Sequence, residues 1–148
     1  MMFYIRLLAI VFILVSVSGC AEMPRYDDFK IHSNNVYVNP SADKAIVYFY
    51  ATEDWRQTLY YMWDSDKKIG AIRSGCYFFY EAEPGAHFFW AETEARSNVY
   101  FDVEAGKTYY IDCRTSLGMW VMTPNIARVT EKIGSSEIKN LKYCTTIR

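Results

Sequence analysis

Cys76 and His87 are of the types that could perform nucleophilic catalysis, since a thiol is activated by a neighbouring imidazole. The sequence places them on two strand-like runs that flank the turn Glu83-Pro84-Gly85. In a hairpin, Cys76 would lie near the open end and His87 beside the turn. About four residues would separate them, or roughly 13 Å at about 3.3 Å per residue. A nucleophile and its base must approach within about 3 Å, so we expect no catalytic pair and expect His87 to make a local hydrogen bond beside the turn.

Glu92 and Glu94 share one face of a predicted strand, about 6.5–7 Å apart at about 3.3 Å per residue. This spacing borders the range of about 6.5–9.5 Å between the carboxylates of inverting glycosidases. Any exposed strand with alternating glutamates produces it, so we expect a solvated face. The sequence has no G-x-S-x-G, H-E-x-x-H or C-x-x-C motif and no phosphate-binding glycine loop, and it therefore predicts no enzyme, metal site or cofactor.

Aromatic side chains form 18% of the chain and include 13 tyrosines. Many predicted strands carry rings on both faces, so one small core cannot hold them all. Most are expected to pack across strands or between two sheet layers. The remainder could form an exposed platform for a glycan, a peptidoglycan strand or a protein, and the candidates are Trp63, Tyr77, Trp90 and Tyr100.

The N-terminus has the pattern of a targeting segment. Arg6 precedes an apolar run from Leu7 to Val17, which is too short for a membrane-spanning helix of about twenty residues but suits a signal peptide. The run ends in Val17-Ser18-Gly19-Cys20, which resembles the lipobox of bacterial lipoproteins. That resemblance implies removal of residues 1–19, acylation of Cys20 and, since position 21 is alanine and not aspartate, transfer to the outer membrane. The alternative is an ordinary secretory signal with Cys20 as a structural thiol.

Acylation of Cys20 leaves three cysteines, Cys76, Cys113 and Cys144. In an oxidising envelope at most one internal disulfide can form among them. Cys113 falls on a predicted core face, so it either pairs with one of the other two or remains a small buried apolar residue. The pairing stays open.

Aromatic and β-branched runs between Gly, Pro, Asn and Ser breaks predict successive antiparallel strands in a domain over residues 44–143. The expected strands are Lys44 to Ala51, Leu59 to Trp63, Lys68 to Arg73, Gly75 to Glu81, Ala86 to Glu92, Asn98 to Val103, Thr108 to Cys113, a short one at Met119 to Met122 and an edge strand at Asn125 to Val129. Helical spacing of Ile133, Ile138 and Leu141, with Ser135 and Ser136 as caps, predicts short helical turns between Thr130 and Lys142.

The turn signals predict three hairpins between consecutive strands, which join around residues 64–67, 83–85 and 104–107. In the third, the apolar pattern places Val103 opposite Tyr109 and keeps Asp102 and Asp112 out of the core. Residues 20–43 are polar and are expected to form a lipidated tether that lifts the domain off the bilayer, with a short edge strand at Val36 to Val38. Residues 144–148 are expected to be a tail.

An ordered set of motifs supports a family resemblance: A-I-V-Y-F-Y at 45–50, I-G at 69–70, G-x-Y-F at 75–78, P-G-x-H at 84–87, A-G-K-x-Y-Y at 105–110 and V-T-E-x-x-G…E-I-x-x-L at 129–141. Together they resemble a bacterial lipoprotein family known only as a domain of unknown function, number twenty-eight forty-six. The spacing of I-G and P-G-x-H is also similar to PEGA-type domains. These resemblances imply an all-β sandwich, transthyretin-like or immunoglobulin-like, and they carry no catalytic residue.

A formal net charge of −1 offers no basic field for nucleic acid. The expectation is a non-enzymatic lipoprotein on the periplasmic face of the outer membrane, held by its lipid anchor and serving as a binding or assembly module for envelope proteins or peptidoglycan. The alternative is a cell-wall carbohydrate-binding or hydrolytic accessory protein that uses the aromatic face and a carboxylate such as Glu92 or Glu94.

Overall fold

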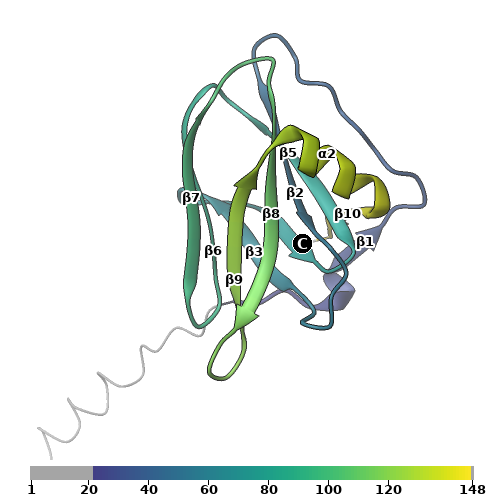
Figure 1. Ribbon diagram of the computed structural model, residues 1–148, viewed down its shortest axis with the longest axis vertical. Coiled ribbons are helices and arrows are strands. Elements are labelled where there is room, and N and C mark those ends of the chain that lie inside the picture. Colours follow the sequence, from purple (N-terminus) through teal and green to yellow (C-terminus); the bar gives the residue numbers. More distant parts are fainter. Residues whose placement is uncertain (1–21, 148) are drawn as a thin grey trace, which may run out of the picture.

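The computed structural model describes residues 22–147 and contains ten strands, one α-helix and two 3-10 helices in that part of the chain (Figure 1). In chain order these are η1 (Tyr26–Asp28), β1 (Phe29–Ile31), β2 (Ala45–Ala51), β3 (Leu59–Asp64), β4 (Lys67–Arg73), β5 (Cys76–Ala82), β6 (Gly85–Glu92), β7 (Arg96–Val103), β8 (Thr108–Leu117), β9 (Met122–Val129), α2 (Glu131–Glu137), η2 (Ile138–Asn140) and β10 (Lys142–Thr146).

The strands form two sheets that pack face to face. The larger has the order β1-β10-β5-β2-β8-β9, and the smaller has the order β4-β3-β6-β7. The smaller sheet is antiparallel throughout, whereas in the larger one β2 runs parallel to β8 and β10 parallel to β5. The predicted all-β sandwich is confirmed, with a mixed larger sheet.

Strand β2 is buried along its whole length, as its two apolar faces predict. Val47 and Phe49 face the core between the sheets, while Tyr48 and Tyr50 belong to a second apolar cluster on the outer face. The predicted helical turns form as α2 and η2, and Ile138 of η2 and Leu141, which follows it, belong to that outer cluster. Ser135 and Ser136 lie inside α2 and do not cap it.

Of the three predicted hairpins, only β3–β4 forms. The turns after β5 and after β7 carry the chain from one sheet to the other, so β5 lies between β2 and β10 and β6 lies between β3 and β7. Val103 therefore pairs with Gly85, and Tyr109 pairs with Val47. The apolar sides of Val103 and Tyr109 still belong to one core cluster, because they meet across the two layers and not along one ladder. Asp112 is buried, contrary to the prediction.

The predicted tether is wrong for its described part. Within it, β1 pairs with β10, so the expected tail at 144–148 begins inside a strand of the larger sheet. No strand forms at Val36 to Val38, but the backbones of Val36 and Val38 exchange hydrogen bonds with the hydroxyls of Tyr77 and Tyr48. The polar sequence did not predict this docking because the partners are hydroxyls of tyrosines that lie on strands, ten residues away for Tyr48 and 41 residues away for Tyr77.

Residues 118–121 form the connection between β8 and β9 and not the predicted short strand. The expected strand at Asn125 to Val129 lies inside the longer β9, which includes Pro124. Proline is tolerated there because β9 is an edge strand and needs no second hydrogen-bonded partner.

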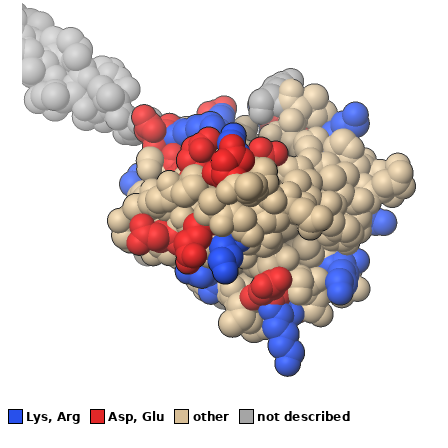
Figure 2. Space-filling model, turned by 90° about the horizontal axis from the view of Figure 1, so that it is seen from above, with Lys and Arg blue, Asp and Glu red and all other residues tan. Residues whose placement is uncertain are grey.

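The connections gather at two ends of the sandwich. We call one the polar end; it consists of residues 41–44, 83–85 and 104–107. Three contacts tie it together: Gly106 N–H donates to Lys44 O (2.9 Å), Ile46 N–H donates to Lys107 O (3.0 Å), and Lys44 Nζ pairs with Glu83 Oε1 (3.3 Å). Figure 2 looks down on the molecule from above the view of Figure 1 and shows acidic and basic side chains in several groups.

The opposite end, which we call the apolar end, consists of residues 22–28, 52–58, 93–95 and 117–122. Because β2 and β8 are parallel, the loops that follow them leave the sandwich at the same end. Hydrogen bonds join these segments: Tyr26 Oη donates to Gln57 Oε1 (3.3 Å), and Thr93 Oγ1 donates to Met122 O (3.0 Å). The β8–β9 loop is the hairpin at the bottom of Figure 1.

Candidate functional site

The predicted aromatic platform is only partly assembled. Trp63 of β3 and Trp90 of β6 stack with ring centroids 5.2 Å apart and an interplanar angle of 12°. From the strands on either side, Arg96 lies 4.2 Å from the Trp90 ring centroid and Lys68 lies 5.9 Å from that of Trp63. Because the strand order is β4-β3-β6-β7, the four side chains form one row of cation–π and ring contacts. The ring faces that a sugar would stack on are largely occupied within this row.

The other two candidates lie elsewhere. Tyr77 is fully buried on the larger sheet, where its ring stacks on Tyr37 at 5.9 Å, so its placement on an exposed face is wrong. Tyr100 is 65% exposed on β7 and lies opposite Phe88 in the register. The structure thus brings together Trp63 and Trp90 alone among the four.

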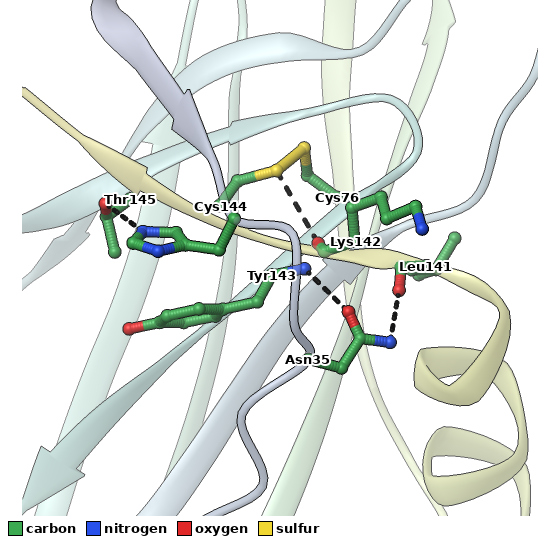
Figure 3. Close-up of a disulfide and its surroundings, with 8 residues drawn as sticks. Asn35, Cys76, Leu141, Lys142, Tyr143, Cys144 and Thr145 are labelled. Atoms are coloured by element: carbon green, nitrogen blue, oxygen red, sulfur yellow. Dashed lines mark hydrogen bonds between the residues drawn. A yellow bond between two sulfur atoms is a disulfide. The ribbon is translucent and has the colours of Figure 1, made fainter.

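A disulfide joins Cys76 to Cys144, with Cα atoms 5.7 Å apart and a sequence separation of 68 (Figure 3). The sequence left Cys113 and Cys144 as possible partners of Cys76. The bond to Cys144 forms because β10 runs alongside β5. Cys113 is the free thiol, and burial raises its pKa well above the ordinary value. Cys20 lies outside the described residues.

Neighbouring contacts hold the end of the chain beside this disulfide. Asn35 donates to Leu141 O (3.0 Å) and accepts from the Tyr143 N–H (3.2 Å), and His32 Nε2 lies 2.9 Å from Thr145 Oγ1. Figure 3 shows Asn35 bridging the backbone just before Cys144. Residues expected to be a tether and a tail therefore hold each other in place.

His87 makes the predicted hydrogen bond beside its turn, with Nε2 2.7 Å from Glu83 O. Its Nδ1 lies 2.7 Å from Asp64 Oδ2, and both side chains are nearly buried. The two ring nitrogens thus face a backbone carbonyl and a carboxylate, both of which accept hydrogen bonds. No ring nitrogen remains free to act as a base. Nothing local in the sequence indicated Asp64, because it comes from another strand.

The two glutamates have separate structural partners. Glu92 Oε2 pairs with the Arg96 guanidinium, with Nε at 2.9 Å. Glu94 accepts hydrogen bonds from the backbone N–H groups of Met119 and Trp120, the latter at 3.1 Å from Oε2. Glu94 is exposed, as predicted, but it lies beyond the end of β6 and also holds the β8–β9 loop. A side chain at Gly118 would overlap the backbone carbonyl oxygen of Val121 as well as the Glu94 carboxylate, so glycine is required there.

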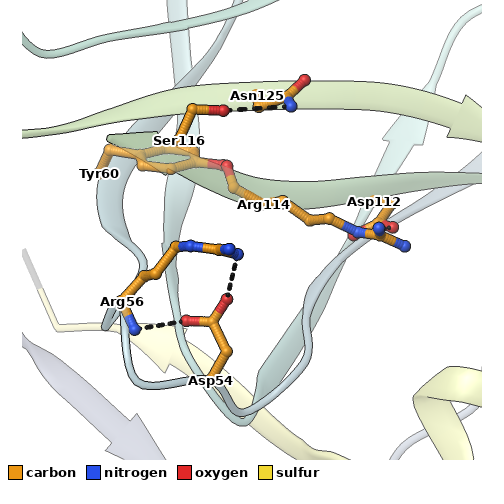
Figure 4. A network of polar contacts seen from close by, with 7 residues as sticks. All are labelled: Asp54, Arg56, Tyr60, Asp112, Arg114, Ser116 and Asn125. Atoms are coloured by element: carbon orange, nitrogen blue, oxygen red, sulfur yellow. Dashed lines mark hydrogen bonds and ion pairs between the residues drawn. The ribbon is translucent and has the colours of Figure 1, made fainter. Parts of the chain in front are cut away.

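A group of polar contacts involves residues of β3, β8, β9 and the 52–58 loop (Figure 4). Asp112 is 4% exposed and accepts from Arg114 Nε at 2.6 Å, which raises the pKa of Arg114. The Tyr60 hydroxyl donates to Arg114 O (3.0 Å), and burial raises the Tyr60 pKa well above its ordinary value. Asp54 accepts from the Arg56 backbone at 2.7 Å. Asp54 is paired with Arg56 and Asp112 with Arg114, each two residues away in sequence, so these charges have a structural role.

Two open hollows lie at the apolar end. One, of about 520 Å³, is lined by Tyr26, Glu53, Asp54, Gln57, Arg73 and Ser74. The other, of about 460 Å³, is lined mainly by apolar side chains, among them Met23, Leu59, Leu117, Met119 and Trp120. Sequence reasoning missed the second hollow because it assigned residues 119–122 to a strand. The signal was available in the run Leu117 to Met122, which is apolar without alternation around one glycine.

Within residues 22–147, no group of three or more His, Cys, Asp or Glu side chains is arranged to hold a metal ion. In the same part of the chain, no helix has the length and apolar character needed to cross a membrane.

Comparison with known proteins gives one relative. An uncharacterized protein of Haemophilus influenzae is 24% identical over 140 residues, which span 93% of this chain and 83% of that protein. No protein-family model matches the sequence, and no solved structure matches it. The chain is thus similar along nearly its whole length to a bacterial protein of unassigned activity.

Proposed function

We propose that this chain is a bacterial envelope lipoprotein, acylated at Cys20, whose β-sandwich is a non-enzymatic binding or assembly module on the periplasmic face of the outer membrane. The observation that carries the proposal is the lipobox-like Val17-Ser18-Gly19-Cys20, which ends six residues before η1 begins at Tyr26. The Cys76–Cys144 disulfide supports it, since such bonds persist in oxidising compartments.

The contacts of the residues that could act in catalysis favour a binding role. His87 has both ring nitrogens engaged, Glu92 is paired with Arg96, and Glu94 holds a loop. Cys113 is buried with a raised pKa, which disfavours the reactive thiolate.

The carbohydrate-binding alternative gains no support from the tryptophans. A sugar stacks on an open ring face, whereas Trp90 lies between Trp63 and Arg96 and donates its indole N–H to Ser65 O (2.7 Å). If peptidoglycan nevertheless binds the purified protein, Trp90→Ala should weaken that binding.

Acylation is tested by growing bacteria that express the chain with labelled palmitate. We expect label on the natural chain and on Cys144→Ser, and none on Cys20→Ser. Cys144→Ser is the matched control because it removes another thiol without touching the lipobox. Equal labelling of Cys20→Ser and the natural chain would overturn the proposal.

The binding role is tested by lysine-directed cross-linking of the acylated protein in its membrane, read by mass spectrometry. Lys44 and Lys107 of the polar end are exposed or half-buried and provide the reactive amines. We expect cross-links from these lysines to one recurrent envelope protein. Cross-links spread evenly over many abundant proteins would contradict an assembly role.

A further inference from the structure

The exposed apolar side chains of this protein are concentrated at one end. Of the thirteen large apolar side chains that are exposed among residues 22–147, seven lie at the apolar end: Met23, Tyr26, Trp55, Leu117, Met119, Trp120 and Val121. Met119 and Trp120 are 83% and 86% exposed at the tip of the β8–β9 loop. Six of the seven, all but Trp55, line one hollow, and a contiguous apolar patch of this kind marks an interaction surface.

The loop backbone is organised in a way that leaves these side chains outward. The Glu94 carboxylate accepts from the N–H groups of Met119 and Trp120, and Thr93 Oγ1 donates to Met122 O. The Met119 and Trp120 N–H groups and the Met122 carbonyl are therefore hydrogen-bonded by side chains of residues 93 and 94. A loop whose backbone is satisfied can present its apolar side chains without ordering them anew on contact.

Chain connectivity indicates what covers this patch. Met23 lines the same hollow as Met119 and Trp120, and Cys20 precedes it by three residues. At no more than about 3.6 Å per residue, the Cα atoms of Cys20 and Met23 are within about 11 Å of each other. Acyl chains on Cys20 would therefore enter the bilayer close to the patch, since residues 26–38 dock on the domain and leave no long tether.

We propose that the β8–β9 loop is a second membrane contact, which inserts Met119 and Trp120 into the phospholipid surface beside the acylated Cys20. This inference rests on the proposed lipid anchor. Tryptophan favours the bilayer interface, where its ring is buried and its N–H stays hydrated. Acidic groups outnumber basic ones at this end and around its hollows, because Glu22, Asp27, Asp28, Glu53, Asp54 and Glu94 stand against Arg25, Arg56 and Arg73. Burial of apolar side chains and not attraction to anionic lipid therefore drives the contact.

The test uses the full acylated chain in phosphatidylcholine vesicles that contain bromine-labelled lipid, which quenches tryptophan fluorescence at short range. A Trp55→Phe background removes the other tryptophan of this end. We expect quenching in that background and its loss when Trp120→Phe is added. We expect no effect of about 0.5 M salt, because such salt shortens the Debye length to a few Å without weakening apolar burial. Trp63→Phe should retain the quenching.

A matched control moves the ring and keeps its exposure. Trp120→Phe combined with Tyr100→Trp places an exposed indole on β7, away from the patch, and it should not be quenched. Protein that floats with vesicles while Trp120 stays unquenched would overturn the loop contact and leave the anchor intact. A dimer that depends on Trp120 in place of quenching would also overturn it. Failure of the natural chain to float, with no palmitate label, would remove both proposals.

Discussion

The two ends of the sandwich are built on the same strands and carry opposite surfaces. At the polar end, short turns expose charged and small side chains, and the ion pair Lys44–Glu83 lies across two of them. At the apolar end, longer connections expose Trp55, Met119 and Trp120. Since β2 and β8 run through both ends, the sheets do not determine this difference. It is determined by which side chains the connecting loops carry.

The ends also differ in how they are held. Near the polar end, the nearly buried side chains of His87 and Asp64 are hydrogen-bonded beside the turn at Glu83. At the other end of β5, a covalent bond joins Cys76 to Cys144, and Glu94 holds the loop tip. One core thus supports two surfaces for different surroundings, one for solvent and one, by our proposal, for lipid.

Raising the pH tests whether both ends depend on one core, and we expect it to have the largest effect. Burial raises the pKa of seven tyrosines above the ordinary value of 10.0, namely Tyr48, Tyr50, Tyr60, Tyr77, Tyr80, Tyr110 and Tyr143. Unfolded tyrosines lose protons near pH 10 while the folded ones retain them, so their contribution to stability is full below pH 10 and is lost as the pH rises above it. We expect one cooperative unfolding transition above pH 10.

Absorbance of tyrosinate near 295 nm and tryptophan emission should report that transition together. The control is the protein in denaturant, whose tyrosines should titrate near 10.0 without cooperativity. Independent titration of all tyrosines near pH 10 with the fold retained would contradict the prediction.

Removing the disulfide should destabilise the protein next most strongly. Cys76→Ser with Cys144→Ser opens a loop of 68 residues, and the chain-entropy argument gives a loss of about 4 kcal/mol in the free energy of unfolding. Denaturant unfolding measures this loss. Cys113→Ser is the matched control, since it removes a thiol that forms no disulfide. An effect confined to Cys113→Ser would show that the covalent link contributes nothing.

Near the polar end, His87→Ala should cost about 2–3 kcal/mol, because it leaves the Asp64 carboxylate nearly buried without its partner. Thermal or denaturant unfolding gives the value. Lys44→Ala removes the exposed pair with Glu83 and should leave stability unchanged within error. Equal losses from the two substitutions would mean that burial does not distinguish the two contacts.

The smallest effect is expected at the loop tip. Glu94→Ala removes the acceptor of two backbone N–H groups at an exposed site and should cost about 1 kcal/mol or less, while Glu94→Gln retains an acceptor oxygen and should cost less still. Hydrogen exchange of the Met119 and Trp120 amides should accelerate in Glu94→Ala. Unchanged exchange would show that the carboxylate does not hold the loop.

Several features were predictable because their signals are local. The doubly apolar β2, the β3–β4 hairpin, α2 with η2, and the hydrogen bond beside the His87 turn all follow from alternation, helical spacing or turn residues within a few positions. The tryptophan pair was also singled out, although not its row with Lys68 and Arg96.

The failures concern partners that are distant in sequence. A Pro-Gly turn allows β5 and β6 to remain in one sheet or to separate into two, and only burial across the sandwich selects the second. Tertiary contacts also decide the pairing of β1 with β10, the hydrogen bond between Asp64 and His87, and the hydrogen bonds of Glu94 to the β8–β9 loop. None of these pairs shares a local pattern.

The sequence alone determined that a strand-rich domain follows an apolar run and a lipobox-like motif, because side-chain alternation and apolar runs are properties of neighbouring residues. Only the tertiary structure decided which strands pair, which cysteines bond and which end carries the exposed rings. Those outcomes depend on contacts between residues tens of positions apart, whose free energy exists only once both surfaces are buried together.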